Sequence, residues 1–208
     1  MELPDGEPLF GPWRVRSVDD LLDDLGRPAL LAVDGRSGSG KTTAVARIVA
    51  RVPGAAVVHT DDIAWYHAMF DWSDLMAAGV LAPVRRGEPV AFRPPPWDER
   101  ERPGAVVVPA ACPLVVVEGV GIGRRDLAEY FDALIWVQTD RVVATARGLA
   151  RDAETVRPEP VAFWDEWEAA ERPFLAAERP WERADVVVAG APELPHDPAT
   201  ELVVAPPL

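Results

Sequence analysis

The chain has 208 residues, of which 49% are hydrophobic, and a formal net charge of −13. This size and composition predict one α/β domain over residues 1–208, and the acidic charge argues against a nucleic-acid partner, because phosphate backbones are bound by basic patches. The single cysteine, Cys112, excludes an internal disulfide. The sequence has no run of about 18 apolar residues, so we expect no membrane partner. Because the acidic N-terminus also lacks the pattern of a signal peptide, we expect a soluble, cytoplasmic protein.

The first third of the chain predicts two helices and two buried strands. Residues 1–16 are rich in proline and glycine and indicate a lead-in arm, after which Ser17 is expected to cap a helix that ends near Leu25. The apolar run 29–33 predicts a buried strand, and residues 43–51 predict a helix. Residues 55–59 predict a second buried strand.

A glycine-rich loop joins the first predicted strand to its helix. Its sequence, Gly35-Arg36-Ser37-Gly38-Ser39-Gly40-Lys41-Thr42, fits G-x-x-x-x-G-K-[ST], the phosphate-binding P-loop. Glycines let backbone N–H groups turn towards phosphate oxygens, at the positive end of the following helix. Lys41, the only lysine, supplies charge for the β- and γ-phosphates, and the Thr42 hydroxyl can bind Mg²⁺. The loop therefore predicts binding of ATP and Mg²⁺.

Two aspartates, Asp61 and Asp62, follow the second strand. The carboxyl ends of strands in open α/β sheets are where ligands bind, so one of the pair is a candidate to take a proton from a substrate hydroxyl or to hold Mg²⁺ through water. The alternative is a helix cap with an acid in the first turn. His59 and His67 lack partners at metal-ligand spacing and are interpreted as packing or surface residues.

Residues 66–104 are the least regular stretch. A helix is expected to start near Phe70 and end near Gly79, and the prolines at 94–96 favour an extended segment. A long insertion with aromatics and charges predicts a substrate-binding lobe, whereas the alternative is a surface loop whose tryptophans cover the core.

The second half predicts the rest of the sheet. Strands are expected at 106–108, 114–119, 133–138 and 185–190, with helices at 126–131, 140–152 and 161–179, before a proline-rich tail with one apolar run at 202–204. Glu118 ends a strand where an acid of the Walker B type can reach the P-loop Mg²⁺, although an acid without a metal role is the alternative. Phe163, Trp164, Trp167 and Phe174 are interpreted as core residues.

Arginines follow the fourth strong strand. Arg147 and Arg151 are four residues apart on one helix face, and Arg157 follows in the next loop. We interpret residues 141–157 as an arginine lid that clamps the transferred phosphoryl group, the alternative being surface ion pairs with Asp152 and Glu154. Together, these elements predict a three-layer P-loop NTPase fold with a mostly parallel central sheet flanked by helices.

Five segments, taken in order, resemble motifs of the uridine kinase branch of P-loop kinases, which is related to phosphoribulokinases and pantothenate kinases. They are Gly35–Thr43, His59–Asp62, Gly87–Asp98, Val117–Gly119 and Arg147–Asp152. The chain departs from that pattern at three places, with Trp97 instead of tyrosine, Gly148 instead of a second lid arginine, and Arg100 and Arg102 where a histidine is usual.

The resemblance implies a role for each matched residue. Asp62 takes the position of the catalytic base, alongside Lys41, Arg147 and Arg151, while Thr42 and Glu118 hold Mg²⁺. The implied nucleotide-binding residues are Gly35, Ser37, Gly38, Ser39, Gly40, Lys41, Thr42 and Thr43. The implied substrate-binding residues are Asp61, Asp71, Trp97, Asp98 and Arg102.

These observations lead to the hypothesis of an ATP-dependent kinase that phosphorylates a hydroxyl of a nucleoside, uridine-like, or of a similar metabolite. The alternatives are a kinase for a sugar, a pantothenate-like alcohol or an antibiotic, and a nucleotide-binding regulatory protein. The absence of Asn-Lys-x-Asp disfavours a GTPase. The oligomeric state stays open.

Overall fold

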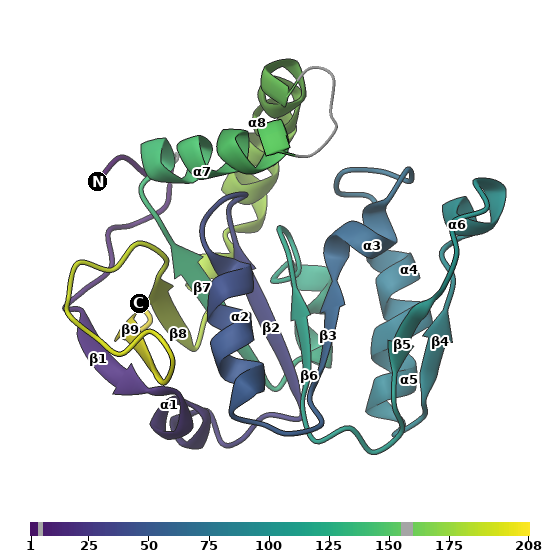
Figure 1. Cartoon of the computed structure of the whole chain (residues 1–208), viewed down its shortest axis with the longest axis horizontal. Coiled ribbons are helices and arrows are strands. Elements are labelled where there is room, and N and C mark those ends of the chain that lie inside the picture. The colour runs from purple at the N-terminus through teal and green to yellow at the C-terminus, as the bar shows by residue number, and fades with distance from the viewer. Residues whose placement is uncertain (4–5, 155–159) are drawn as a thin grey trace.

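A seven-stranded sheet forms the centre of the protein (Figure 1). The computed structural model describes residues 1–3, 6–154 and 160–208. The strand order is β1-β9-β8-β7-β2-β6-β3. The strands are β1 (Arg14–Ser17), β2 (Leu30–Gly35), β3 (Ala56–His59), β6 (Val115–Glu118), β7 (Ala133–Gln138), β8 (Val186–Ala189) and β9 (Glu201–Ala205).

The five strands from β8 to β3 run parallel, which confirms the predicted mostly parallel sheet. In the central strand β2, Val33 pairs with Glu118 of β6 on one side and with Ile135 of β7 on the other. Every residue of β2 is buried, as expected for a parallel strand covered on both faces. Because the five strands are parallel, their carboxyl ends meet at one edge of the sheet, where the P-loop begins.

Helices cover both faces of the sheet, so the predicted three layers are present. On one face α1 (Val18–Asp24) and α2 (Lys41–Ala50) pack on Leu31 and Val33. On the other, Leu30 and Ala32 join a cluster with side chains of α8 (Pro160–Glu178) and of the short 3₁₀ helices Arg125–Tyr130 and Pro180–Glu182. Alternate residues of one strand thus supply both cores.

The two termini add an edge to the sheet that was not expected. Residues of the predicted lead-in arm form β1, which pairs antiparallel with β9, and β9 pairs antiparallel with β8. β9 contains the apolar run 202–204 of the tail. The expected cap is present, since Ser17 Oγ accepts the Asp20 N–H at 3.1 Å.

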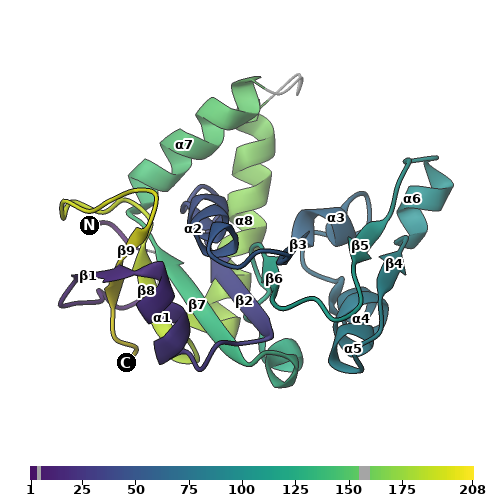
Figure 2. The same ribbon diagram turned by 60° about the horizontal axis from the view of Figure 1, so that its bottom comes forward.

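Beyond β3, residues 60–108 form a separate group of short elements (Figure 2). These are α3 (Thr60–Ala64), α4 (Ser73–Met76), a π-helical turn (Ala77–Leu81), α5 (Ala82–Arg85), α6 (Pro95–Glu99) and the antiparallel pair β4 (Val90–Phe92) and β5 (Val106–Val108).

Two expectations for this segment were wrong. The helix continues past Gly79 to Arg85. The π turn accommodates Pro83, which has no backbone N–H to donate. Gly79 has no Cβ, so the Phe92 ring can pack directly against the helix at this point. The three prolines do not form one extended run: Pro94 is extended, but Pro95 begins α6, since proline fits the first helical turn.

At the carboxyl edge of the sheet, α7 (Arg141–Glu154) follows β7 and packs against α8 (Figures 1 and 2). Asp140 caps α7 through the N–H groups of Val142 and Val143. The P-loop, the ends of β3 and β6, and this helix pair therefore surround one region.

Candidate active site

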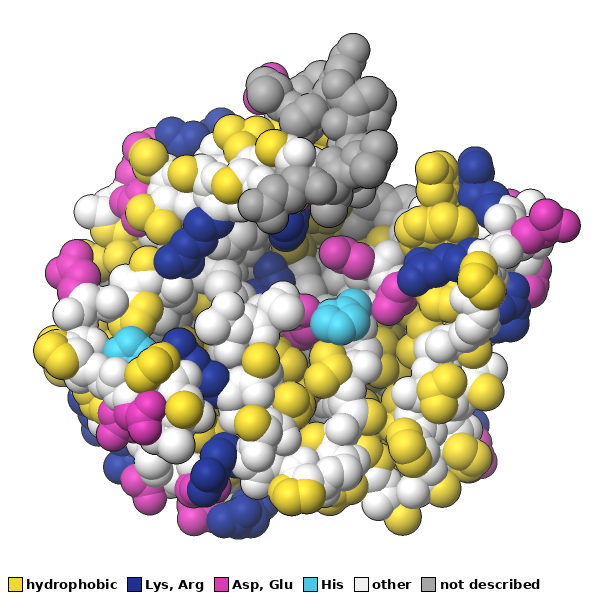
Figure 3. All heavy atoms as spheres, in the orientation of Figure 1, with side chains coloured by type: hydrophobic (Ala, Val, Ile, Leu, Met, Phe, Trp, Pro, Cys, Tyr) yellow, Lys and Arg dark blue, Asp and Glu magenta, His cyan; other side chains and the backbone are white. Residues whose placement is uncertain are grey.

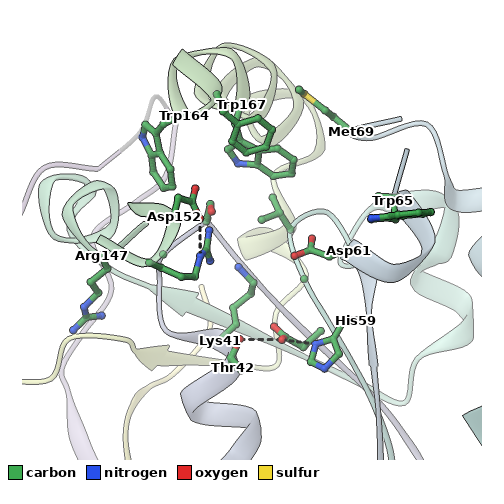
Figure 4. Close-up of a pocket in the computed structure, with 18 of the residues that line it drawn as sticks. Lys41, Thr42, His59, Asp61, Trp65, Met69, Arg147, Asp152, Trp164 and Trp167 are labelled. Atoms are coloured by element: carbon green, nitrogen blue, oxygen red, sulfur yellow. Dashed lines mark hydrogen bonds and ion pairs between the residues drawn. The ribbon is translucent and has the colours of Figure 1, made fainter. Parts of the chain in front are cut away.

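A cavity of about 1020 Å³ opens at the carboxyl edge of the sheet (Figure 3). Its lining comes from the P-loop, the ends of β3 and β6, residues 64–69, and the helices α7 and α8. Figure 4 shows how side chains from these separate elements converge. The lining residues are Ser37, Gly38, Gly40, Lys41, Thr42, His59, Asp61, Ala64, Trp65, Tyr66, His67, Ala68, Met69, Glu118, Gly119, Val120, Arg147, Arg151, Asp152, Phe163, Trp164 and Trp167.

The P-loop backbone forms one wall of this cavity. Gly38 has a φ of +75°, and a Cβ there would overlap the carbonyl oxygen of Ala144 in α7, so only glycine fits between loop and helix. The loop ends at Lys41, where α2 starts, and the first N–H groups of a helix have no intrahelical partners. These donors and the helix dipole make this end suited to anions.

Lys41 lies over the loop from which it arises. Its Nζ donates hydrogen bonds to the carbonyl oxygens of Gly35 and Arg36, both at 2.8 Å, and the residue is only 8% exposed. The backbone thus presents its ammonium group to the cavity. This cradle of N–H groups and a single cation fits the phosphates of a nucleotide.

Thr42 and Glu118 meet beside Lys41. Thr42 Oγ1 donates to Glu118 Oε1 at 3.0 Å, and His59 Nδ1 lies 2.8 Å from the same oxygen (Figure 4). Burial opposes ionisation of Glu118, but hydrogen bonds from His59 and Thr42, with Lys41 nearby, hold its pKa below the ordinary value. The Glu118 hydrogen bond in turn raises the pKa of His59.

The donor set suits Mg²⁺ bound together with phosphate. Among the described residues, no group of three or more His, Cys, Asp or Glu side chains is placed to hold a metal alone. Mg²⁺ in nucleotide sites needs no such cage, because one or two protein oxygens, phosphates and water complete its shell. The Thr42 hydroxyl and the Glu118 carboxylate are the protein oxygens available here.

The structure separates the two neighbouring aspartates. Asp61 lines the cavity and Figure 4 shows its carboxylate directed into it. Asp62 lies outside the lining, and its Oδ1 pairs with Arg102 Nη2 at 2.5 Å. Arg102 also stacks over the Trp97 ring, 3.7 Å from its centroid, and Trp97 Nε1 donates to the Asp62 carbonyl oxygen at 2.8 Å.

The other expected substrate residues lie away from the cavity. Trp97 is 4% exposed and belongs to the hydrophobic core, Asp98 pairs with Arg93 at 2.7 Å, and Asp71 is exposed. Of the predicted insertion 66–104, only residues 66–69 line the cavity. Trp97, Asp98 and Arg102 instead hold the short elements together around Asp62.

Both arginines of the expected lid line the cavity from α7. Arg147 Nη1 donates to the carbonyl oxygen of Gly190 at 2.9 Å, and Figure 4 shows its guanidinium directed away from Lys41. Arg151 Nε pairs with Asp152 Oδ1 at 3.0 Å. Arg157 lies outside the described residues.

Aromatic side chains of α8 face the cavity as well as the core. Phe163, Trp164 and Trp167 line it, and we call these three the aromatic wall. Trp164 is 5% exposed and its ring lies against Gly148, where a Cβ would overlap the indole. The expected core role is confirmed for Trp164, which is buried, and for Trp167 and Phe174, which pack against the hydrophobic core. Phe174 stacks on Phe70 at 4.2 Å and does not line the cavity, whereas the two tryptophans also line it.

Within the P-loop motif, not every residue reaches the cavity. Ser37 and Gly38 line it, whereas Ser39 is buried behind the loop and Gly35 and Thr43 do not line it. The pattern match alone does not make this distinction.

Two buried acids were missed from the sequence. Asp34, the last side chain of β2 before the loop, accepts N–H groups of Gly35, Gly121 and Gly123 at 2.7, 2.9 and 2.8 Å. Burial raises the pKa of Asp34 to about 6 despite these donors. Glu171 of α8 accepts the Ser37 N–H at 2.8 Å. A charged residue at the end of an apolar run, directly before the glycine loop, was the signal for Asp34, whereas Glu171 looked like an ordinary helix-surface acid.

Comparison with known proteins identifies the fold. A Bacillus stearothermophilus structure described as a possible uridine kinase matches with a TM-score of 0.57 at 18% identity, over 82% of this chain and 96% of that one. The chain has the P-loop NTPase fold. A Silicibacter structure, described provisionally as a fructose transport system kinase, matches with a TM-score of 0.54 at 18% identity, over 78% and 95% of the two chains. No protein-family profile and no curated protein matches the sequence.

The described part of the chain contains no helix long and apolar enough to cross a membrane.

Proposed function

We propose that this protein is an ATP-dependent kinase that transfers the γ-phosphate to a hydroxyl group of a small molecule. One observation carries the proposal: a single cavity brings Lys41, Thr42 and Glu118 of the phosphate side together with the carboxylate of Asp61 and the aromatic wall. A nucleotide-binding switch needs the first group but has no use for an acid beside an aromatic surface. Phosphoryl transfer to an alcohol needs both.

On the nucleotide side, Lys41 and the N–H groups at the start of α2 would hold the β- and γ-phosphates. Thr42 and Glu118 would hold Mg²⁺, which neutralises charge on the phosphate oxygens. Arg151 lines the same cavity from α7 and would supply further positive charge for the transferred group, whereas Arg147 would first have to leave the carbonyl oxygen of Gly190. The fit of all these residues to ATP·Mg²⁺ supports ATP as the donor.

On the acceptor side, the geometry favours Asp61 as the residue that accepts the hydroxyl proton. A base must come within hydrogen-bond reach of the proton it takes, and Asp61 faces the cavity, whereas Asp62 is held by Arg102 outside it. The family resemblance assigns this role to Asp62. We therefore propose Asp61 as the base and Asp62 as a residue that positions α3.

The aromatic wall favours an acceptor with a flat, apolar part. Trp65, Tyr66 and Met69 line the same cavity, so an inserted ring would have further aromatic and apolar surface to contact. A nucleoside such as uridine combines such a ring with a primary hydroxyl, and one solved structure with this fold is described as a possible uridine kinase. A free sugar or a pantothenate-like alcohol would leave this surface without a partner.

The direct test is ADP formation from ATP·Mg²⁺ in the presence of uridine, cytidine, ribose, fructose or pantothenate. We expect one of the two nucleosides, which carry an aromatic base, to raise the rate, and we expect the Lys41→Met variant to abolish the response. A basal ATPase rate that none of the compounds changes would refute the kinase assignment and favour a regulatory protein.

Two matched variants then test the base. Asp61→Asn should lower kcat by about 10²–10⁴, the usual size of general-base loss, and leave the affinity for a non-hydrolysable ATP analogue unchanged. Asp62→Asn, one residue away, should lower kcat by less than about tenfold by the same reasoning. The opposite order would return the role to Asp62.

A further inference from the structure

Glu171 of α8 binds two consecutive residues of the P-loop. Its Oε1 accepts the Ser37 N–H at 2.8 Å, and its Oε2 accepts Nη2 and Nε of Arg36 at 3.2 and 3.3 Å. Glu171 is 2% exposed, and a carboxylate buried to this extent is stable only when it is paired and hydrogen-bonded. The loop conformation and the position of α8 are therefore tied together by one side chain.

Arg36 depends on this carboxylate. It is buried too, and the next closest acid, Glu168, lies 3.8 Å from its Nη2. Its Nη1 has no hydrogen-bond partner in the described part of the chain. Displacing Glu171 would leave a buried guanidinium without its principal partner, so the pair resists independent movement.

The same carboxylate also contacts the aromatic wall. Trp167, one helical turn before Glu171, donates from Nε1 to Glu171 Oε1 at 3.2 Å. That oxygen thus receives both the N–H of the phosphate loop and the indole N–H of a residue that lines the acceptor side of the cavity. Any movement of the Glu171 carboxylate therefore changes the hydrogen bonds to Ser37 and to Trp167 together.

We propose that Glu171 is a positioning residue that couples the acceptor side of the cavity to the phosphate loop. It shapes the loop for the nucleotide and transmits the loop's state to Trp167, and by linkage a compound bound at Trp167 biases the loop in return. The inference rests on the proposed function, because it takes the P-loop as the nucleotide site and the Trp167 side of the cavity as the acceptor site. It adds a reciprocal coupling between the two substrates.

Two substitutions at position 171 and one matched control test the proposal. Glu171→Gln places an amide donor opposite N–H donors. Glu171→Asp keeps the buried charge beside Arg36 and so protects folding, but the aspartate side chain is one methylene too short to reach both Arg36 and Ser37. Glu168→Gln removes a neighbouring acid that contacts Arg36 but not Ser37. Calorimetry with Mg²⁺ and a non-hydrolysable ATP analogue should show about tenfold weaker binding for both Glu171 variants, the loss of about one charge-assisted hydrogen bond. The affinity of the control variant Glu168→Gln for the same analogue should stay within about twofold of the wild-type value.

Tryptophan fluorescence separates coupling from a merely structural role. The chain has eight tryptophans, so the contribution of Trp167 is obtained by subtracting the signal of Trp167→Phe from that of the wild type. We expect the ATP analogue to change this difference signal in the wild type and in Glu168→Gln, but not in Glu171→Asp. Wild-type affinity in both Glu171 variants, or a Trp167 response that persists in Glu171→Asp, would overturn the inference. Failure of the wild type itself to bind the analogue would overturn the proposed function and the inference with it.

Discussion

The contact between Gly148 and Trp164 predicts a substitution whose effect changes sign with its background. Gly148 is buried in the middle of α7, and a Cβ there would overlap the indole of Trp164 on α8. In an unobstructed helix, Gly→Ala stabilises by about 1 kcal/mol, because alanine loses less conformational freedom on folding. Here the added methyl must push the indole out of place, and overpacking of this kind costs about 1–3 kcal/mol.

The two terms leave Gly148→Ala destabilising by about 1 kcal/mol in the wild-type background. In a Trp164→Ala background the obstruction is gone, and the same substitution should stabilise by about 1 kcal/mol. The coupling energy of the double-mutant cycle is therefore about 2 kcal/mol. Trp164→Ala also removes part of the aromatic wall, so its effect on activity is a separate matter from the cycle.

The assay is equilibrium urea unfolding of the four proteins, monitored by the helix signal in circular dichroism at about 222 nm. Equal m-values would show that the four proteins unfold the same surface, and the free energies of unfolding then close the cycle. If Gly148→Ala stabilised both backgrounds equally, the indole would not rest on α7 at this position, and the argument for a packed α7–α8 contact would fail.

Three further predictions concern the proposed metal ligand Glu118, a buried acid and an ion pair. Glu118→Gln should raise the Mg²⁺ concentration for half-maximal ADP formation at least about tenfold, measured by Mg²⁺ titration, because it weakens the oxygen set shared with Thr42. Burial raises the pKa of Asp34 from 3.8 to about 6, so the folded state keeps this proton to a higher pH than the unfolded state does. Through this carboxyl, the free energy of unfolding should therefore fall by about 2 kcal/mol as pH rises from 4 to 6. Urea unfolding across that range should show this slope in the wild type relative to Asp34→Asn, and parallel profiles would contradict it. Arg102→Met should lower the free energy of unfolding by about 1 kcal/mol through loss of the contacts with Asp62 and Trp97, while ADP formation stays within about threefold of wild type; a loss of activity with unchanged stability would place Asp62 in the chemistry.

The parts of the fold that local patterns determine were predictable from the sequence. Leu30–Gly35 is buried on both faces, so its apolar run was continuous and pointed to a central parallel strand. The glycine and lysine pattern then identified the turn into α2 because the backbone requirement at Gly38 is local. Ser17 predicted the start of α1 for the same reason, because an N-cap acts on a backbone N–H only three residues away.

Features that depend on partners far along the chain were not predictable. β1 consists of Arg14–Ser17, too short and too polar to be recognised alone, and it exists because it pairs with residues 201–204. Asp62 and Arg102 are 40 residues apart, and nothing local indicates that they form a pair and leave Asp61 to face the cavity. Side-chain direction at a strand end is decided by such contacts, which is why the choice between the two aspartates stayed open.

The departure at Gly148 is best understood together with Trp164. In the kinases that this chain resembles, a second arginine occupies the lid position where Gly148 stands. Here an indole from α8 fills the space above the glycine, so an arginine could not be restored at 148 without first removing Trp164. This cavity therefore has an aromatic surface where the resemblance places a positive charge. Under the proposed function, charge on the transferred group would be balanced by Lys41, Mg²⁺ and Arg151. We therefore expect Gly148→Arg alone to lower the rate of ADP formation, and to raise it only in a Trp164→Ala background, where the indole no longer blocks the added side chain.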